Sequence, residues 1–316
     1  NGRDRTAVCC LSSLNLEKYD EWKDDSVMIN DVMRFLDNVL TDFIERAPEQ
    51  FDDAKYSAEK ERSVGLGVMG FHSYLQQHSI PLESVMSKAW NKKIFKHIQE
   101  HVDQASKDLA DERGPCPDAA DYGYNERFSN KTAIAPTASI SIICGGASPG
   151  VEPVAANSYT HKTLSGSFNV RNRYLVELLE KHGKNTDDVW SGITTNQGSV
   201  SHLDFLTDLE KDVFKTAFEL DQKWIIELSG DRTPYISQAQ SINLFVPADI
   251  HKRELHKIHF DAWKKGLKSL YYCRSKSIQR AENINDAKST DVLANVYKNK
   301  ATKTDEPEYE ECLSCQ

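Results

Sequence analysis

The chain has 316 residues, enough for two average domains or one large α/β unit with a buried core. Its 39 Lys and Arg against 48 Asp and Glu give a net charge of -9, so it lacks the basic excess of a protein that grips a phosphate backbone. No apolar stretch approaches the roughly 18 residues that span a bilayer, and no signal peptide is visible. We therefore expect a soluble cytoplasmic protein that binds neither nucleic acid nor membrane.

Hydrophobic periodicity predicts short strands that alternate with longer helices. Strands are expected at residues 6–16, 132–134, 241–246 and 269–273, and helices at residues 26–43, 85–112, 173–182, 203–228 and 250–267. Residues 138–143 fit either a strand or the start of a buried helix, because periodicity does not decide over so few residues. The alternation predicts an α/β fold with a mostly parallel sheet flanked by helices.

Residues 280–316 are polar, charged and poor in aliphatic side chains, so they cannot bury enough apolar area to offset chain entropy. We predict that residues 1–279 form the folded part and that residues 280–316 form a flexible tail. The tail carries Cys312 and Cys315, and a dithiol with this spacing cycles readily to a disulfide.

Seven cysteines, an odd number spread thinly, argue against the disulfide framework of a secreted protein. A zinc site needs four ligands, and no second pair lies near Cys312 and Cys315 to complete one. His251, His256 and His259 lack the i, i+4 spacing of a helical metal pair. We therefore expect no metal site in this chain.

Gly65, Gly67 and Gly70 fit the GxGxxG pattern of dinucleotide-binding loops and precede an apparent helix that contains Phe71. That pattern requires a hydrophobic strand immediately before it, whereas residues 55–62 are charged. We interpret the glycines as positions of close helix packing.

Residues 135–141, Ala-Pro-Thr-Ala-Ser-Ile-Ser, combine a strand end, a proline, hydroxyl groups and free backbone amides. If a helix starts here, its first amides and partial positive charge form an anion site suited to a phosphate. A simple ST-turn explains the same residues equally well, so the pattern alone leaves both interpretations open.

Two pairs of adjacent residues, Cys9-Cys10 and Tyr271-Tyr272, fall on predicted strands, where neighbouring side chains point to opposite faces. Only one cysteine of the first pair then faces a site. Adjacent tyrosines are common in strands, so ordinary packing is the alternative for the second pair.

Five segments, in the same order along the chain, resemble the C-terminal part of the large catalytic subunit of class I ribonucleotide reductases, in a form similar to phage and some bacterial enzymes. The segments are residues 7–16, 62–71, 136–140, 270–282 and 312–315. The resemblance implies an α/β fold that is the second half of the family's ten-stranded barrel, followed by the flexible tail. The family's radical cysteine and specificity site precede these segments. We therefore expect a split-gene product, a spliced C-terminal piece or a truncated product.

The resemblance also implies roles for individual residues. Cys9 takes the place of one of the two cysteines that are oxidised as a ribonucleotide is reduced, and Cys312 and Cys315 resemble the tail dithiol that reopens the resulting disulfide. Tyr271 and Tyr272 resemble the radical-transfer pair, which class II relatives with cobalamin do not need. Because such a pair must exchange an electron, we expect local distortion at the strand end to bring the two rings into van der Waals contact. The substrate diphosphate is expected on the backbone of a loop made by Pro136, Thr137, Ala138, Ser139 and Ile140.

The implied activity is reduction of ribonucleoside diphosphates to deoxyribonucleoside diphosphates for DNA synthesis, by an oligomer. The implied partners are the N-terminal half of the large subunit, the small subunit with its tyrosyl radical and dimetal centre, and thioredoxin or glutaredoxin. ATP and deoxynucleotide effectors are expected on the N-terminal half, and no cofactor on this chain. If a phage encodes the chain, we expect the protein in the host cytoplasm.

Two alternatives from other classes stay open. One is a non-catalytic half-barrel with a structural role. The other is a thioredoxin-like dithiol oxidoreductase, which usually needs its CxxC at a helix N-terminus after a strand, a context that the tail lacks.

Overall fold

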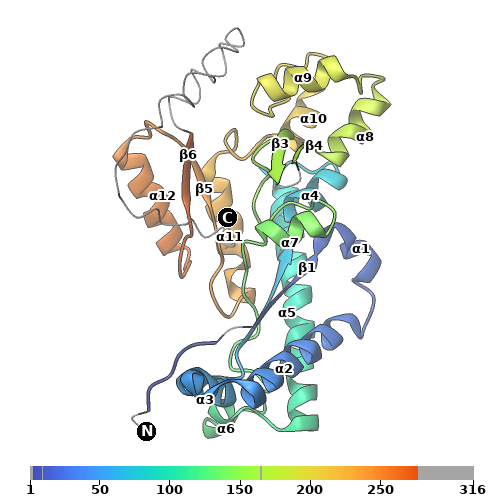
Figure 1. The fold of residues 1–316 in the computed structure, drawn as a ribbon. Helices are drawn as coiled ribbons and strands as arrows, with labels where there is room; N and C mark the ends of the chain where they lie inside the picture. The colour runs from blue at the N-terminus through green and yellow to red at the C-terminus, as the bar shows by residue number, and fades with distance from the viewer. Residues whose placement is uncertain (1–2, 9, 164–165, 277–316) are drawn as a thin grey trace, which may run out of the picture.

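The computed structural model describes residues 3–8, 10–163 and 166–276 of the chain. The flexible tail predicted after residue 279 lies outside the described residues. Within the described part, no helix is both long enough and apolar enough to cross a membrane. Figure 1 shows the path of the chain, with its long helices beside a narrow set of strands.

The strands form two parallel pairs and one antiparallel hairpin. They are β1 (Cys10–Asn15), β2 (Val64–Met69), β3 (Ser158–Thr163), β4 (Gly166–Arg171), β5 (Leu244–Pro247) and β6 (Cys273–Lys276). β1 pairs with β2 and β5 with β6 in parallel, whereas β3 and β4 are antiparallel. Isolated parallel bridges join Leu66 of β2 to Thr132, and Ile134 to Gln240, which lies shortly before β5. This succession confirms the predicted α/β class with mostly parallel strands.

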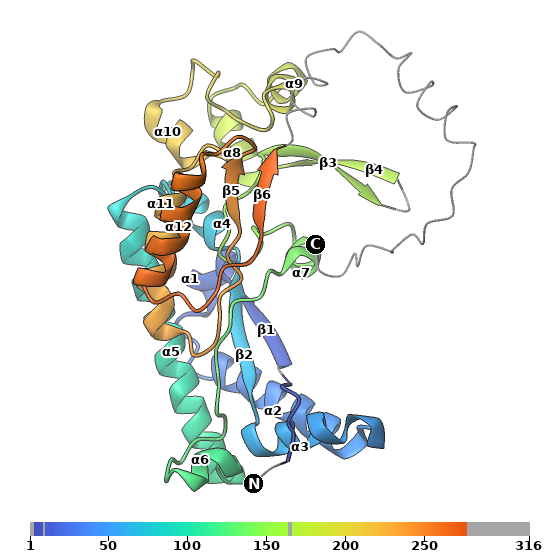
Figure 2. The same cartoon turned by 90° about the vertical axis from the view of Figure 1, so that its left-hand side faces the viewer.

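Helices surround these strands. Within the described ranges they are α1 (Tyr19–Trp22), α2 (Met28–Arg46), α3 (Asp52–Glu61), α4 (Phe71–Gln77), α5 (Val85–Arg113), α6 (Pro117–Asp121), α7 (Ala138–Ile143), α8 (Arg173–Lys181), α9 (Asp187–Thr195), α10 (Asp208–Val213), α11 (Gln222–Arg232) and α12 (Lys252–Lys264). In Figure 2, α5, α11 and α12 lie on one side of the strands, and α7 with the β3–β4 hairpin lies on the other.

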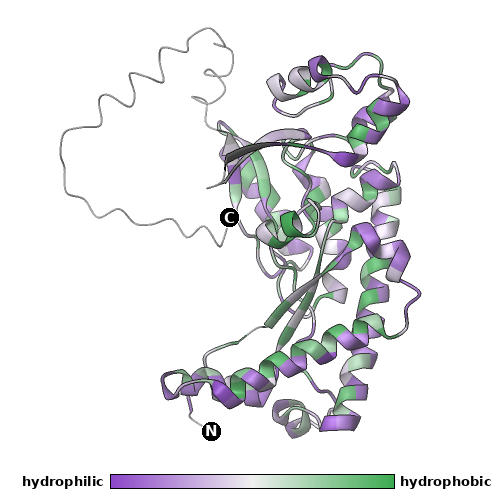
Figure 3. Cartoon of the chain, turned by 45° about the vertical axis from the view of Figure 1, so that its right-hand side comes forward, coloured by the Kyte–Doolittle hydropathy of each residue, from purple (hydrophilic) through white to green (hydrophobic). Residues whose placement is uncertain are grey.

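The 29-residue helix α5 confirms the prediction for residues 85–112, and local signals set its ends. The Ser84 hydroxyl accepts a hydrogen bond from the Ser87 N–H at 3.1 Å, and Gly114 follows the last turn with a φ of +84°. Buried side chains such as Val102 belong to the same core as Leu40 of α2, against which α5 packs. Figure 3 shows the mixed hydrophobic and hydrophilic residues along both helices.

The glycine-rich segment forms the buried strand β2, and the helix α3 precedes it in place of the strand that a dinucleotide motif requires. A Cβ on Gly67 would lie 2.2 Å from the carbonyl oxygen of Ala133. Close packing therefore explains Gly67, but its neighbour is a backbone segment and not the predicted helix. Gly70, with a φ of +80°, makes the turn into α4.

The single helix predicted at residues 203–228 is wrong, because two caps interrupt it. The Thr207 hydroxyl accepts from the Glu210 N–H at 3.3 Å, and the Glu210 carboxylate accepts from the Thr207 N–H at 2.8 Å, which starts α10. The Asp221 carboxylate accepts from the Lys223 N–H at 2.9 Å and starts α11. Apolar spacing extended across both caps and concealed the break between the helices.

Three predicted strands are shorter or displaced in the structure. β1 begins at Cys10, β5 at Leu244 and β6 at Cys273. The displacement of β6 matters most, because Tyr271 and Tyr272 precede this strand and do not lie on it. The β3–β4 hairpin is an element that the periodicity did not predict.

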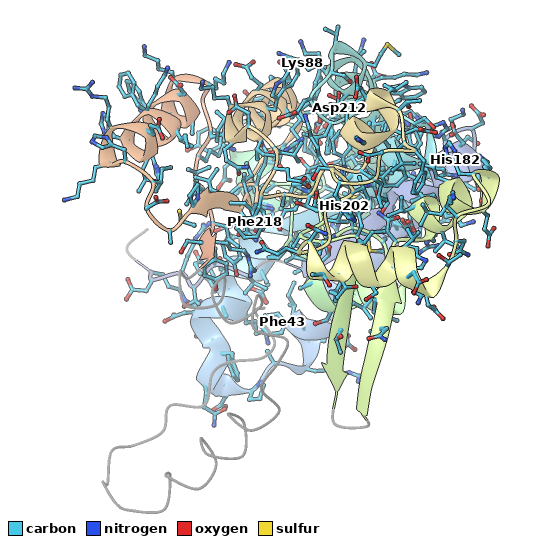
Figure 4. The ribbon with its side chains drawn as sticks, turned by 90° about the horizontal axis from the view of Figure 1, so that it is seen from above. Phe43, Lys88, His182, His202, Asp212 and Phe218 are labelled. Carbon is cyan, nitrogen blue, oxygen red and sulfur yellow. The ribbon has the colours of Figure 1, made fainter. Side chains whose placement is uncertain are left out.

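α8, α9 and α10 enclose a second core, which contains Leu175, Trp190 and Phe214. His182, which follows α8, pairs with Glu210 of α10 at 2.8 Å and connects two of these helices. Figure 4 views this part of the molecule from above and labels His182. The main core, by contrast, lies between the parallel strands and the helices α2, α4, α5 and α11.

Three arginine side chains meet around the fully buried carboxylate of Asp37 on α2. Its oxygens accept hydrogen bonds from Arg62 at 2.8 Å, Arg127 at 2.9 Å and Arg113 at 2.8 Å. Burial alone would raise the pKa of Asp37, but the hydrogen bond from Arg127 and the charge of Arg62 outweigh it and lower the pKa below its usual value. The Asp37 contribution to stability is thus present above the unfolded pKa of about 3.9 and is lost as the pH falls through the lower folded value.

Asp37→Ala is expected to lower the free energy of unfolding by about 3–5 kcal/mol in urea at pH 7, because it leaves buried guanidinium groups without their counter-charge. The matched control is Asp42→Ala on the same helix, whose carboxylate pairs at the surface with Arg46 and is 59% exposed. The control should cost about 0.5 kcal/mol or less. Equal losses in the two variants would show that the arginine cluster is not a determinant of the fold.

Candidate functional site

A cavity of about 390 Å³ lies between β1 and the loop that leads into α7. Its lining residues are Leu11, Ser12, Ser13, Ala135, Pro136, Thr137, Ala138, Ser139, Ile140 and Tyr271. The structure therefore brings together three segments that the sequence singled out separately: the first strand, the hydroxyl-rich loop and the tyrosine pair. None of these lining side chains carries a charge, so any anion in the cavity would be held by dipoles.

The loop acquires its shape from three consecutive residues. Pro136 restricts Ala135 to extended backbone and so ends the short strand segment before it. Thr137 takes the left-handed conformation, with a φ of +57°, and α7 begins at Ala138. The first helical hydrogen bond joins the Ser141 N–H to the Thr137 carbonyl at 2.9 Å. Residues 138–143 are thus the start of a helix and not a strand.

The first turn of α7 supplies the dipoles. The amides of Ala138, Ser139 and Ile140 precede the first intrahelical hydrogen bond, so they have no acceptor within the helix. All three residues line the cavity. The local chemistry therefore suits an anion, as the sequence pattern suggested.

A second loop supports this one from behind. The Thr137 hydroxyl accepts a hydrogen bond from the Gly150 N–H at 2.7 Å. Gly150 has a φ of +49°, and a Cβ there would lie 2.9 Å from the Ala135 carbonyl oxygen. Ser148 exchanges two hydrogen bonds with Ser73 at the start of α4, at 2.9 and 3.1 Å. The cavity wall is therefore anchored to the main core.

Tyr271 and Tyr272 stand side by side in the structure. Their ring centroids are 4.1 Å apart, and the ring planes meet at 52°. Their backbone is held by Ile242, whose carbonyl accepts from the Tyr271 N–H at 2.9 Å, and by Asn243, whose side-chain oxygen accepts from the Tyr272 N–H at 3.0 Å. Both residues lie before β6 and not on it, so they do not alternate as strand neighbours, and the expected contact between the two rings is confirmed.

All three predicted redox cysteines, Cys9, Cys312 and Cys315, lie outside the described residues. Cys10, the first residue of β1, packs against the main core, whereas Leu11 is 52% exposed and lines the cavity. In the described part of the chain, no group of three His, Cys, Asp or Glu side chains is placed to hold a metal ion.

Sequence reasoning missed Ser12, Ser13 and Glu152. The two serines line the cavity from β1. Glu152 follows the supporting loop and is only 7% exposed, and this burial raises the pKa of its carboxyl to about 7, although the side chain of Asn243 and the charge of Arg274 oppose the rise. The two serines follow Cys9 and Cys10 on the same predicted strand, so their position in the sequence could have indicated them. No spacing or motif marks Glu152, since its burial depends on the packed loops.

Comparisons with known proteins agree on one family. The family profile described as ribonucleotide reductase, barrel domain, matches residues 1–126 and 118–273. The chain is 53% identical over 284 residues to the ribonucleoside-diphosphate reductase large subunit of Invertebrate iridescent virus 6, an alignment with 89% of this chain and 29% of that protein. It is 40% identical over 316 residues to the putative large subunit of Frog virus 3, covering 99% of this chain and 53% of that protein.

A solved structure is similar as well. The class Id ribonucleotide reductase alpha subunit of Actinobacillus ureae superposes with a TM-score of 0.81 and 40% sequence identity, covering 87% of this chain and 51% of that one. The chain thus spans about half, or less, of the length of these relatives. The similarity extends to the barrel segments that line the cavity.

Thr137→Ala is expected to destabilise the chain by about 1–3 kcal/mol, because it leaves the Gly150 amide without its acceptor beside the cavity wall. Thr137→Ser keeps the hydroxyl and is the matched control, with a loss of about 1 kcal/mol or less. Urea unfolding followed by far-UV circular dichroism measures both variants. If alanine and serine behaved alike, the hydroxyl would not anchor the loop.

Proposed function

The chain belongs to the ribonucleotide reductase family, and on this basis we propose that it is the C-terminal part of a class I large subunit, active in reducing ribonucleoside diphosphates to deoxyribonucleoside diphosphates. One observation carries the proposal: a single uncharged cavity joins β1, the loop of residues 136–140 and Tyr271. A purely structural half-barrel does not require this convergence. A thioredoxin-like fold is not supported, because the matched family is that of the barrel domain.

The diphosphate of the substrate would bind at the first turn of α7. The amides of Ala138, Ser139 and Ile140 and the partial positive charge of the helix end favour phosphate oxygens. The absence of charge among the lining residues limits the attraction to these dipoles. Pro136 and Thr137 would shape the loop and would not contact the phosphate through charge.

Cys9 is proposed as one of the two thiols that supply the reducing equivalents. Replacing a 2′-hydroxyl by hydrogen consumes two electrons and two protons, which two thiols provide as they form one disulfide and the hydroxyl leaves as water. Cys10 packs against the core, which favours its neighbour for this role. Cys312 and Cys315 would then reopen the disulfide by thiol exchange and would themselves be reduced by thioredoxin or glutaredoxin.

Tyr271 and Tyr272 are proposed to carry the radical between subunits. The two ring centroids are 4.1 Å apart, which is close enough for the rings to exchange an electron. Tyr271 also lines the cavity where the substrate would lie. The radical would originate at the dimetal centre of the small subunit and pass to a cysteine on the N-terminal half of the large subunit. That half would also hold the ATP and deoxynucleotide effector sites, and the complete enzyme would be an oligomer.

The proposal predicts that this chain, combined with a polypeptide carrying the N-terminal half and with the small subunit, reduces ribonucleoside diphosphates. Tyr271→Phe and Tyr272→Phe should each abolish turnover and leave substrate binding intact, because phenylalanine keeps the ring packing but cannot be oxidised at the potential available. Tyr122→Phe, at an 81% exposed position, is the control and should retain full turnover. Near wild-type turnover in both variants would refute the radical role.

Ala138→Asp is expected to weaken binding of a ribonucleoside diphosphate about tenfold or more, equivalent to about 1.4 kcal/mol, since it places a negative charge at the proposed phosphate site. Ala138→Ser is similarly small and neutral and should bind almost normally. Calorimetric titration of the reconstituted large subunit measures the dissociation constant. Unchanged affinity in the aspartate variant would place the diphosphate elsewhere.

A further inference from the structure

Glu152 is a buried acid that no step of the proposed reaction uses. It is 7% exposed, and its Oε1 atom has no hydrogen-bond partner in the described part of the chain. Its N–H donates to the Pro149 carbonyl at 2.9 Å, which ties it to the loop that supports Thr137 through Gly150. A buried carboxyl oxygen without a hydrogen-bond partner costs free energy of folding, so its presence at this position calls for an explanation.

Both polar neighbours of Glu152 also contact Tyr272. Asn243, immediately before β5, acts on the carboxyl through its side chain and backbone, and its side-chain oxygen accepts from the Tyr272 N–H at 3.0 Å. Arg274 on β6 places its guanidinium carbon 5.7 Å from the centroid of the Tyr272 ring, and its charge also acts on Glu152. Among the described residues, Arg274 is the charged group that acts on this carboxyl.

Burial raises the pKa of Glu152 to about 7, against the opposing influence of Asn243 and Arg274. The carboxyl is therefore neutral in slightly acidic solution and ionised in slightly basic solution. When ionised, it attracts the Arg274 guanidinium; when neutral, it leaves this cation to the face of the Tyr272 ring.

We propose that Glu152 is a positioning residue for the tyrosine pair, and that its proton decides whether Arg274 is held by the carboxylate or lies over the ring of Tyr272. Asn243 keeps the carboxyl and the Tyr272 backbone in a fixed relation during this exchange. A cation over an aromatic ring disfavours removal of an electron from it, so ionised Glu152 makes Tyr272 easier to oxidise. This functional consequence rests on the proposed radical role, whereas the linkage between the three residues does not.

The linkage is tested on this chain with ¹³C-labelled tyrosine rings, by NMR between pH 5 and 9. Tyr271→Phe and Tyr272→Phe identify the two signals. The Tyr272 signal should shift with a midpoint at about pH 7. Glu152→Gln should remove this inflection, and Arg274→Gln should remove most of the pH-dependent shift of the Tyr272 signal, because no cation is left to move between the carboxylate and the ring. Glu254→Gln, an exposed acid on α12, should leave the titration unchanged.

An inflection that persists in Glu152→Gln, or a Tyr272 signal that does not move near pH 7 in the unaltered chain, overturns the proposal. If Glu152→Gln does not fold, ¹³C-labelled glutamate in the unaltered chain decides the question. The Glu152 carboxyl and the Tyr272 ring must then show the same midpoint, and different midpoints refute the linkage.

Activity of the reconstituted reductase separates this proposal from the proposed function. Turnover limited by tyrosine oxidation should rise between pH 6 and 8 through the Glu152 titration, and Glu152→Gln should flatten that rise. A chain that shows the NMR linkage but supports no reduction contradicts the proposed function alone. A functional reductase without the linkage contradicts the inference about Glu152 alone.

Discussion

The missing side chain at Gly67 is the constraint on which the cavity depends. The carbonyl oxygen of Ala133 occupies the place where a Cβ would stand, so only glycine lets β2 meet residues 132–134 at this distance. This contact fixes how closely residues 132–134 approach β2, and the loop of residues 136–140 that lines the cavity follows them directly along the chain.

Hydrogen bonds join the loops around the cavity to one another and to the main core. Thr137 accepts from Gly150, and two residues further Glu152 lies among groups that also hold Tyr272. The proposed phosphate loop and the proposed radical pair thus share one support, the segment of residues 148–152, which Ser73 anchors to α4. A disturbance of this segment would reach both parts of the site, although they are far apart in the sequence.

Two buried acids, Asp37 and Glu152, differ in how their charge is compensated. Asp37 is fully buried but is surrounded by three arginines, so it stays ionised and stabilises the packing of α2 against the end of α5. Glu152 has one carboxyl oxygen without a hydrogen-bond partner among the described residues, and its burial raises its pKa to about 7 although Arg274 opposes the rise. The first arrangement suits a structural role, and the second suits a group that responds to its surroundings.

The sequence by itself determined what depends on neighbours along the chain. The caps at Ser84 and Gly114 and the apolar stripe between them specify α5, and Pro136 with the residues after it marks the loop. Only the tertiary structure decided that the tyrosine rings meet before β6, that two helices replace the one predicted at residues 203–228, and that Glu152 is buried beside Asn243. Periodicity shows which side of an element is apolar, but the burial of a charge and the contact of two rings depend on segments that meet only when the chain is folded.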